Sequence, residues 1–218
     1  MKSNGSNCAL YAARAWLGTF TLILGIFGAA NVLADDPFNE PFRVSSSTFV
    51  NNGVLPISMI ENSLSAGKNV CSVNGAVGLD QSPEVSWKHA PWRTRSFVVT
   101  LFDVTASFTH WGMYNISAAT DSLPAGVGAA GSTYGAQVLN DFGDQSYDGP
   151  CPPIGVQPDS HQYVLTVYAL DEELRLPAFA NFPDYAEALW YALARAAANG
   201  HVLASASIDG FYSATPPP

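Results

Sequence analysis

Three runs of β-branched, aromatic and aliphatic residues dominate the hydrophobic pattern: Ser96 to Asp103, Trp111 to Ile116 and His161 to Leu170. In these runs nearly every position is apolar, rather than every second position. This pattern is typical of strands that are buried on both faces in the middle of a sheet. The sequence therefore predicts three central strands.

Shorter segments before these runs predict further strands. The segment from Phe42 to Val50 and the segment from Val54 to Ile60 are joined by Asn51-Asn52-Gly53. Because an Asn-Gly step is a strong hairpin signal, we expect the two segments to pair. Additional short strands are expected at Val70 to Val73, around Val85 and Trp87, and at His201 to Ile208.

One helix is expected, from Tyr185 to Ala198, because this segment is rich in Ala, Leu and Glu and ends at Asn199-Gly200. Ser117 to Asp148 shows no sustained period, so we predict a long surface connection there. Many short strands with a single late helix predict a mainly antiparallel β-sandwich with one or two peripheral helices.

Composition limits the classes of function. The chain has 218 residues, of which 48% are hydrophobic and 12% charged, so it can fill the core of a single domain. Nine basic residues against 18 acidic ones give a net charge of -9, which opposes attraction to a phosphate backbone. Nucleic acid is therefore not expected as a partner.

The N-terminus has the pattern of a secretory signal peptide. Lys2 and Arg14 precede an apolar run from Ala15 to Ala30, and Val32-Leu33-Ala34 offers a cleavage site. The run is short for a spanning helix, although an uncleaved anchor remains the alternative. We therefore expect a leader at 1–34, one domain at 35–218 with a disordered tail at 213–218, and a secreted or periplasmic location.

The expected export of the protein bears on whether its cysteines are free or form a disulfide. Because Cys8 lies in the expected leader, only Cys71 and Cys151 remain, and an oxidising compartment favours a disulfide between them. Such a bond would tie the loop around Cys151 to a segment far upstream. Two buried free thiols are the alternative.

A rigid loop precedes the last of the three central strands. Residues 149–155 contain three prolines and two glycines in seven positions, which fixes most of the backbone angles. The loop leads to His161 and Tyr163, whose side chains share one strand face and could form the wall of a pocket. An ordinary Pro-rich turn before a strand is the alternative.

Three ionisable residues lie at the ends of the predicted strands: Asp103, His110 and His161. Because burying a charge is costly unless it is partnered, we expect the acid and the two imidazoles to satisfy one another. A carboxylate orients a neighbouring imidazole and raises its pKa, so the outward nitrogen keeps a proton. The sequence thus predicts an anion-accepting pocket where the three side chains meet.

A set of short motifs between Phe42 and Tyr212 occurs in the order and with the gaps of one known family. The motifs are Ser82-Pro83-x-x-x-Trp87, Ser96-Phe97 running to Asp103, His110-Trp111 followed by Asn115-Ile116, Asn140-Asp141, Tyr147-x-Gly149-Pro150-Cys151-Pro152-Pro153-x-Gly155, His161-x-Tyr163, and Tyr168-Ala169-Leu170-Asp171. With them the chain resembles the phosphatidylethanolamine-binding proteins, in the bacterial and archaeal branch often labelled Raf kinase inhibitor-like.

The resemblance implies a large antiparallel sheet packed on a smaller one, with a small pocket for phosphate-like anions or phospholipid head groups. It implies an exported, non-enzymatic binding protein without a cofactor or a metal. The residues that it assigns to ligand binding are Asp103, His110, Tyr147, Gly149, Cys151, His161 and Tyr163.

Two departures from the family pattern leave the choice of ligand open. The usual Asp-Pro-Asp-Ala-Pro is Asp103-Val104-Thr105-Ala106-Ser107 here, so the second acid and both prolines are absent. The usual His-Arg-Tyr is His161-Gln162-Tyr163. The rim of the pocket is therefore expected to be less acidic and less rigid than in the family.

Other functions remain open at this point. The family also suggests an inhibitor or regulator of a protease, a kinase or a host signalling protein, acting through the pocket rim and residues 117–148. A metal-dependent hydrolase could use His110, His161 and Asp103 as a facial triad. A homodimer is also open, and His89 and His201 are expected to be structural.

Overall fold

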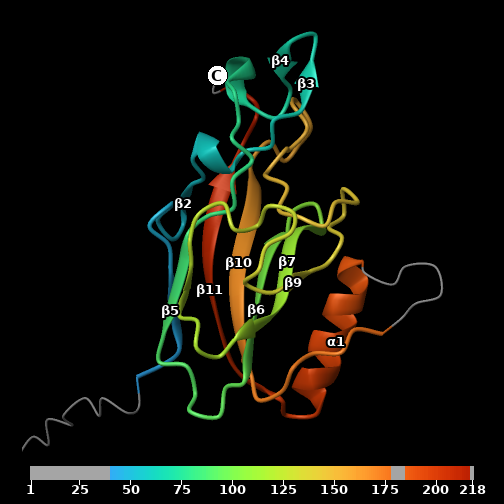
Figure 1. Ribbon diagram of the computed structural model, residues 1–218. Helices are drawn as coiled ribbons and strands as arrows, with labels where there is room; N and C mark the ends of the chain where they lie inside the picture. Colours follow the sequence, from blue (N-terminus) through green and yellow to red (C-terminus); the bar gives the residue numbers. More distant parts are fainter. Residues whose placement is uncertain (1–39, 178–184, 217–218) are drawn as a thin grey trace, which may run out of the picture. The chain divides into compact units, whose positions relative to one another are not determined.

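Six strands form the main sheet of the computed structural model, which describes residues 40–177 and 185–216. All neighbours in this sheet are antiparallel except β2 and β11, which run parallel. Its order is β2 (Gly53–Val54), β11 (Val202–Tyr212), β10 (His161–Leu170), β6 (Ser96–Asp103), β7 (Phe108–Ser117) and β9 (Ala136–Gln137) (Figure 1). The three predicted central strands are therefore adjacent, as β10, β6 and β7.

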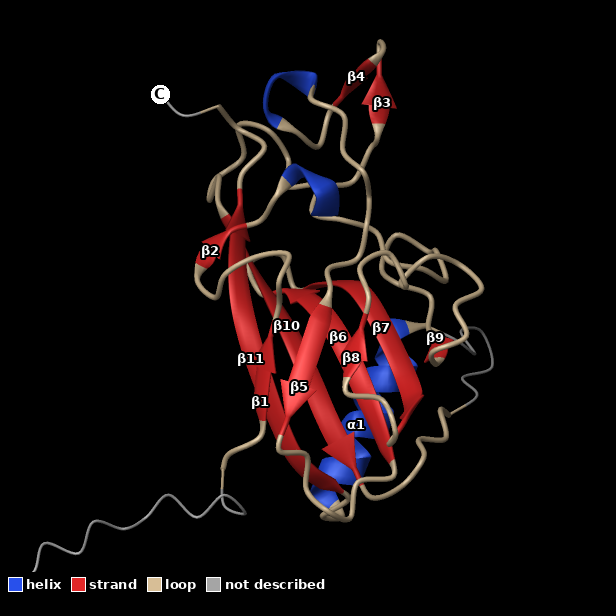
Figure 2. Cartoon of the chain, turned by 60° about the vertical axis from the view of Figure 1, so that its left-hand side comes forward, coloured by secondary structure: helices blue, strands red, loops and turns tan. Residues whose placement is uncertain are grey.

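A smaller sheet packs on one face of the main sheet. It consists of β1 (Arg43–Ser45), β5 (Val85–Lys88) and β8 (Ser122–Leu123), and Figure 2 shows it in front of the six strands. Trp87 from the smaller sheet contacts Phe97 from β6, with ring centroids 4.9 Å apart. The main hydrophobic core fills the space between the two sheets, which confirms the predicted sandwich.

The helix α1 (Ala186–Ala198) covers the other face of the main sheet (Figure 2). Leu189 and Leu193 from the helix pack with Val98 and Leu170 from the sheet in a second buried cluster. Gly112 permits this close approach, because a Cβ atom there would lie 2.7 Å from the Leu189 side chain. The predicted helix is confirmed to within one residue at its start.

The hairpin predicted around Asn51-Asn52-Gly53 is wrong. β1 pairs with β5, whereas β2 pairs in parallel with β11, where Gly53 lies opposite Gly210. The Asn52 amide donates to the Asp209 carbonyl, so the turn carries the chain from one sheet to the other. The strand predicted to continue to Ile60 ends at Val54, and a 3-10 turn, η1 (Ile57–Met59), follows Pro56.

The strand predicted at Val70 to Val73 is also wrong. The chain instead forms a small hairpin of β3 (Leu64–Ser65) and β4 (Lys68–Asn69), followed by the 3-10 turn η2 (Val73–Gly75). The buried side chain of Asn69 holds this irregular backbone, donating to the carbonyls of Glu61 and Ala76 and accepting from the Cys71 amide. In this segment Cys71 packs into the core, whereas Val70 is 41% exposed.

The ends of the chain were predicted as a leader and a disordered tail. The expected leader lies outside the described residues, as do the last two residues of the tail. Residues 213–216 are not disordered, because Ala214 is 1% exposed and the Thr215 hydroxyl accepts from the Gly155 amide at 3.0 Å. Contacts group residues 36–218 into one compact unit. Within the described ranges, no helix is both long and apolar enough to cross a bilayer.

Candidate functional site

A cavity of 180 Å³ lies where β6 ends, β10 begins and β7 passes beside them. The strand register creates this meeting point, because Asp103 lies directly opposite Tyr163 on one side and Phe108 on the other. The cavity is lined by Asp103, Ala106, Phe108, His110, Phe142, Cys151, Pro152, Pro153, His161 and Tyr163. Five of the seven residues assigned by resemblance are therefore brought together.

Asp103 and His161 form a buried pair. The Nδ1 atom of His161 lies 2.6 Å from Oδ2 of Asp103. The other carboxylate oxygen accepts from the amides of Thr105 and Ala106, at 2.8 and 2.9 Å. Because these amides fix the carboxylate, the carboxylate in turn fixes the orientation of the His161 ring.

His110 does not share this acid, contrary to the expectation that one carboxylate satisfies both imidazoles. Its Nδ1 lies 2.9 Å from the Asp148 carbonyl, which can only accept, so Nδ1 carries a proton. Burial lowers the pKa of His110 to about 4, and its side chain is therefore neutral at pH 7. The remaining nitrogen, Nε2, is a hydrogen-bond acceptor.

Tyr163 supplies an unused donor. Its hydroxyl is buried and has no hydrogen-bond partner of good geometry among the described residues. Burial, together with the nearby charge of Asp103, raises the pKa of Tyr163 well above its ordinary value, so the hydroxyl keeps its proton. The ring lies edge-on to His110, with centroids 5.3 Å apart. A buried donor without a partner is costly unless a ligand or water accepts from it.

The rest of the lining is apolar, and sequence reasoning missed most of it. Phe108 and Phe142 contact each other with ring centroids 4.6 Å apart, and Phe142 also contacts His110. Phe142 is 48% exposed and forms part of the rim. The Asn140 side chain positions it by accepting from its amide. The Asn140-Asp141 motif directly before Phe142 is the feature of the sequence that could have predicted its place at the cavity.

Tyr147 and Gly149, which the resemblance assigns to ligand binding, are not among the described residues that line the cavity. The Tyr147 hydroxyl points away and donates to the Met59 carbonyl at 2.8 Å. The Gly149 amide donates to Oδ1 of Asp80 at 2.7 Å. Both residues hold the Pro-rich loop against residues 59–61, so they support the wall from behind.

Gly149→Ala is expected to destabilise the protein by about 2 kcal/mol, the typical cost of overpacking a well-packed contact. A Cβ atom at this position would lie 2.0 Å from the Met59 carbonyl oxygen, so the backbone must move. Urea unfolding measures the change. Pro153→Ala, at an exposed position of the same loop, is the control and should have little effect. Equal midpoints for the two variants would contradict this account of the packing.

The predicted disulfide between Cys71 and Cys151 is present, with Cα atoms 4.4 Å apart. Cys71 is fully buried, whereas Cys151 lines the cavity. The bond therefore fastens the cavity wall to a segment 80 residues earlier in the chain.

A cluster of three carboxyl groups lies behind the wall. Ligand atoms of Glu61, Asp80 and Asp148 all lie within 4.8 Å of one another. Burial and then the charge of Asp80 raise the pKa of Glu61 to about 7. In the described residues this is the one group of three ligand-type side chains with such spacing. The alternative facial triad of Asp103, His110 and His161 is not among the groups with this spacing in the described residues.

The other two histidines lie away from the cavity lining. His89 contacts Arg43, with Nε2 2.9 Å from the guanidinium. His201 lies after α1, with Nδ1 2.9 Å from Oδ1 of Asp171. These contacts are consistent with the structural roles expected of them.

A family profile described as phosphatidylethanolamine-binding protein matches residues 45–213, which is most of the chain. The chain belongs to the phosphatidylethanolamine-binding protein family. The predicted family membership is thus confirmed.

Three bacterial proteins resemble this chain over most of its length. It is 35% identical to the UPF0098 protein YbhB of Escherichia coli over 169 residues, covering 72% of this chain and all of that protein. The crystal structure of E. coli YbcL superposes with a TM-score of 0.62 at 28% identity, covering 80% of this chain and 99% of YbcL. A protein named putative lipoprotein LppC, from Mycobacterium tuberculosis, is 27% identical over 70% of this chain and 67% of LppC.

Proposed function

We propose that this chain is a non-enzymatic binding protein that holds a phosphate-like anion or a phospholipid head group in the 180 Å³ cavity. The observation that carries the proposal is the buried hydroxyl of Tyr163, which has no protein acceptor of good geometry and belongs to the cavity lining. A ligand oxygen is the partner that this donor lacks. Family membership supports a binding role of this kind.

The polar groups of the cavity fit a phosphate group that carries one proton. One of its charged oxygens would accept from the Tyr163 hydroxyl, beside the His161 ring that Asp103 orients. Its own hydroxyl would donate to the free nitrogen of neutral His110. The volume equals about six waters, so a head group fits and acyl chains stay outside.

The lining also supports a role in binding rather than in catalysis. Two residue types that commonly act as nucleophiles, serine and threonine, do not occur among the described residues that line the cavity, and Cys151 is held in the disulfide. The Asp103 carboxylate is occupied by two amides and an imidazole. These groups position a ligand.

Export from the cytoplasm is part of the proposal. The pattern of charged and apolar residues in positions 1–34 supports it, as does the disulfide, because such bonds persist in oxidising compartments. The name lipoprotein of the relative LppC points to the cell envelope for that protein. Sequencing the N-terminus of the secreted or periplasmic protein tests for cleavage after Ala34.

Tyr163→Phe is expected to weaken the binding of inorganic phosphate and phosphoethanolamine at least tenfold, because a hydrogen bond to a charged ligand is lost while the ring is kept. NMR titration of the His110 and His161 resonances measures the affinity. Tyr168→Phe is the matched control, because Tyr168 lies on the same strand but outside the cavity lining. Tighter binding of phosphoethanolamine than of phosphate would identify a head group as the preferred source.

Two results would refute the proposal. One is the absence of any shift of the two histidine resonances at millimolar ligand. The other is an equal loss of affinity in Tyr163→Phe and Tyr168→Phe, since this would show that the cavity does not hold the ligand.

A further inference from the structure

Aromatic side chains form one corner of the cavity at Tyr163. Phe108 and Phe142 both line the cavity, with ring centroids 4.6 Å apart and ring planes inclined at 65°. Because Phe142 is 48% exposed, this pair lies where the cavity opens to water. The ring of His110 contacts both phenylalanines, at centroid distances of 5.1 and 5.6 Å. Three inclined rings therefore meet at the mouth of the cavity, and we call them the aromatic corner.

The cavity offers no free carboxylate to a ligand. Among the described residues that line it, Asp103 is the one acid. Its Oδ1 accepts from the amides of Thr105 and Ala106, and its Oδ2 faces His161. The four residues that follow Asp103 contain no further acid. A primary ammonium group has three N–H donors, and a buried donor without an acceptor is costly. A ligand with such a group would therefore lose hydration here without gaining a carboxylate.

A quaternary ammonium group avoids this cost. It carries a positive charge but no N–H donor, and it binds over the faces of aromatic rings through cation–π attraction. The two phenylalanine rings of the aromatic corner can supply this attraction. His110 does not oppose it, because burial lowers the pKa of His110 to about 4 and leaves the ring neutral at pH 7. The aromatic corner thus suits a cation that needs no hydrogen-bond acceptor.

The aromatic corner lies one ring away from the place where the phosphate is expected. The buried hydroxyl of Tyr163 is the donor that lacks a protein acceptor. The ring of His110 contacts Tyr163 on one side and Phe142 on the other, with centroid distances of 5.3 and 5.6 Å. A phosphate held at Tyr163 would therefore place an ammonium group at the aromatic corner, if a short spacer such as that of choline or ethanolamine joins the two groups.

We propose that the cavity selects phosphate esters that carry a quaternary ammonium group, such as phosphocholine, over esters that carry a primary ammonium group, such as phosphoethanolamine. Phe108 and Phe142 are the residues that determine this specificity. The specificity rests on the proposed function, because it requires a phosphate group held beside Tyr163.

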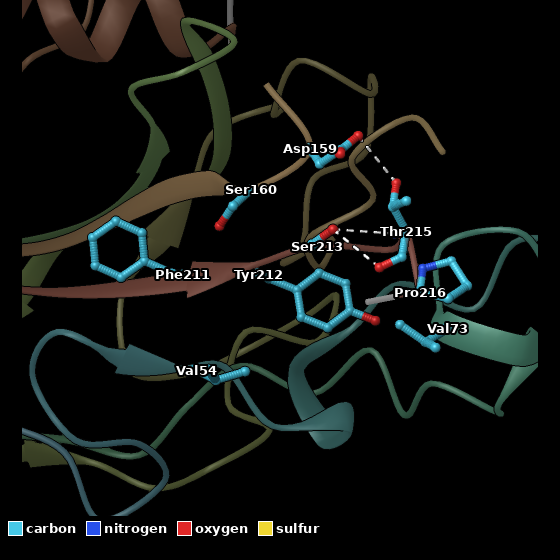
Figure 3. A pocket seen from close by; sticks show the side chains of 9 residues that line it. All are labelled: Val54, Val73, Asp159, Ser160, Phe211, Tyr212, Ser213, Thr215 and Pro216. Atoms are coloured by element: carbon cyan, nitrogen blue, oxygen red, sulfur yellow. Dashed lines mark hydrogen bonds between the residues drawn. The ribbon is translucent and has the colours of Figure 1, made fainter. Parts of the chain in front are cut away.

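A second hollow offers an acid and has to be distinguished from the cavity. It has a volume of about 540 Å³, with Asp159 on one side and Val73 and Tyr212 on the other (Figure 3). Asp159 accepts from the Thr215 hydroxyl at 3.3 Å. The described lining of this hollow contains no lysine or arginine for a phosphate group. An ammonium compound could bind here through its charge alone, so a variant of Asp159 belongs in the test.

Isothermal titration calorimetry of the full chain with inorganic phosphate, phosphoethanolamine and phosphocholine tests the proposal. The wild-type protein should bind phosphocholine about fivefold more tightly than phosphoethanolamine, as expected for a cation–π contact. Phe142→Leu should remove this preference, whereas Phe142→Trp should retain it. Ala106→Asp adds a carboxylate to the cavity lining and should shift the preference toward phosphoethanolamine. Trp92→Leu and Asp159→Asn are the controls and should keep the wild-type preference, because both residues lie outside the described lining of the cavity.

The outcomes separate this specificity from the proposed function. If none of the three ligands binds, the proposed function is refuted and the specificity with it. If phosphate and phosphoethanolamine bind but phosphocholine binds no more tightly than phosphoethanolamine, the specificity alone is overturned. A preference that persists in Phe142→Leu, or that is lost in Asp159→Asn, would also overturn it.

Glycerophosphocholine identifies the source of the ligand. Tighter binding of this compound than of phosphocholine would support the proposal with a lipid head group as the source. Weaker binding would support it with the free ester as the source.

Discussion

Replacing both Cys71 and Cys151 by serine is expected to lower the free energy of unfolding by about 4 kcal/mol. The bond closes a loop of 80 residues, and in the chain-entropy model the stabilisation grows with the logarithm of loop length. The native wall would keep other contacts, because Tyr147 still donates to Met59 and Gly149 to Asp80. The double variant should therefore fold, with a looser cavity wall and weaker binding of phosphate.

Urea unfolding of the double variant, of the oxidised wild-type protein and of the reduced wild-type protein measures this effect. The reduced protein should match the double variant, because both lack the bond. If oxidised and reduced proteins unfold at the same urea concentration, the bond does not stabilise the fold.

The sequence predicted well those strands that are buried along their whole length and the helix that has a local stop signal. β6 and β10 were located to the residue because nearly every position of these strands is β-branched, aromatic or aliphatic. α1 was located because its stop signal, Asn199-Gly200, is local. The burial of a strand and the end of a helix can both be predicted from residues that are adjacent in the sequence.

The N-terminal strands failed for the opposite reason. β2 is two residues long, and its partner is Gly210–Phe211, more than 150 residues later. Asn51-Asn52-Gly53 forms a turn as predicted. The residues of the turn do not determine which strand pairs with the segment that follows it. Pairing between distant segments is decided by packing, which local sequence does not contain.

The contacts of the candidate site also fall into those that the sequence predicts and those that it does not. The pairing of Asp103 with His161 was predictable, because both stand at strand ends and a buried acid needs a partner. The partner of His110 was not predictable, because it is the backbone carbonyl of Asp148, which any residue type could supply. Resemblance placed Tyr147 in the cavity wall, but only the geometry shows that its hydroxyl points away.

Protonation of His110 is expected to cost about 3 kcal/mol of stability between pH 6.5 and pH 4. The pKa of His110 is about 4 in the folded protein and 6.5 when the ring is exposed to water, mainly because burial disfavours the charged ring. The folded state therefore binds this proton less well than the unfolded state. Its contribution to stability is complete above pH 6.5 and is lost as the pH falls toward 4.

Titration of Glu61 changes the stability in the opposite direction to His110, over nearly the same range of pH. Burial and the charge of Asp80 raise the pKa of Glu61 from 4.5 to about 7, so the folded state favours the protonated acid. The stability that it contributes is complete below pH 4.5 and is lost as the pH rises through 7. Burial also raises the pKa values of Asp80, Asp141 and Asp148, which act in the same direction as Glu61, so the wild-type profile masks the contribution of His110.

Urea unfolding of matched variants separates the two groups. Glu61→Gln should steepen the loss of stability on acidification, because it removes one of the opposing titrations. Adding His110→Asn to Glu61→Gln should flatten the profile between pH 4 and 6.5, since an amide can still donate to the Asp148 carbonyl but does not titrate. Adding the exposed His89→Asn instead is the control and should leave the slope in place. A slope that persists without the His110 imidazole would show that another group causes the acid sensitivity, and that His110 is not held neutral by burial.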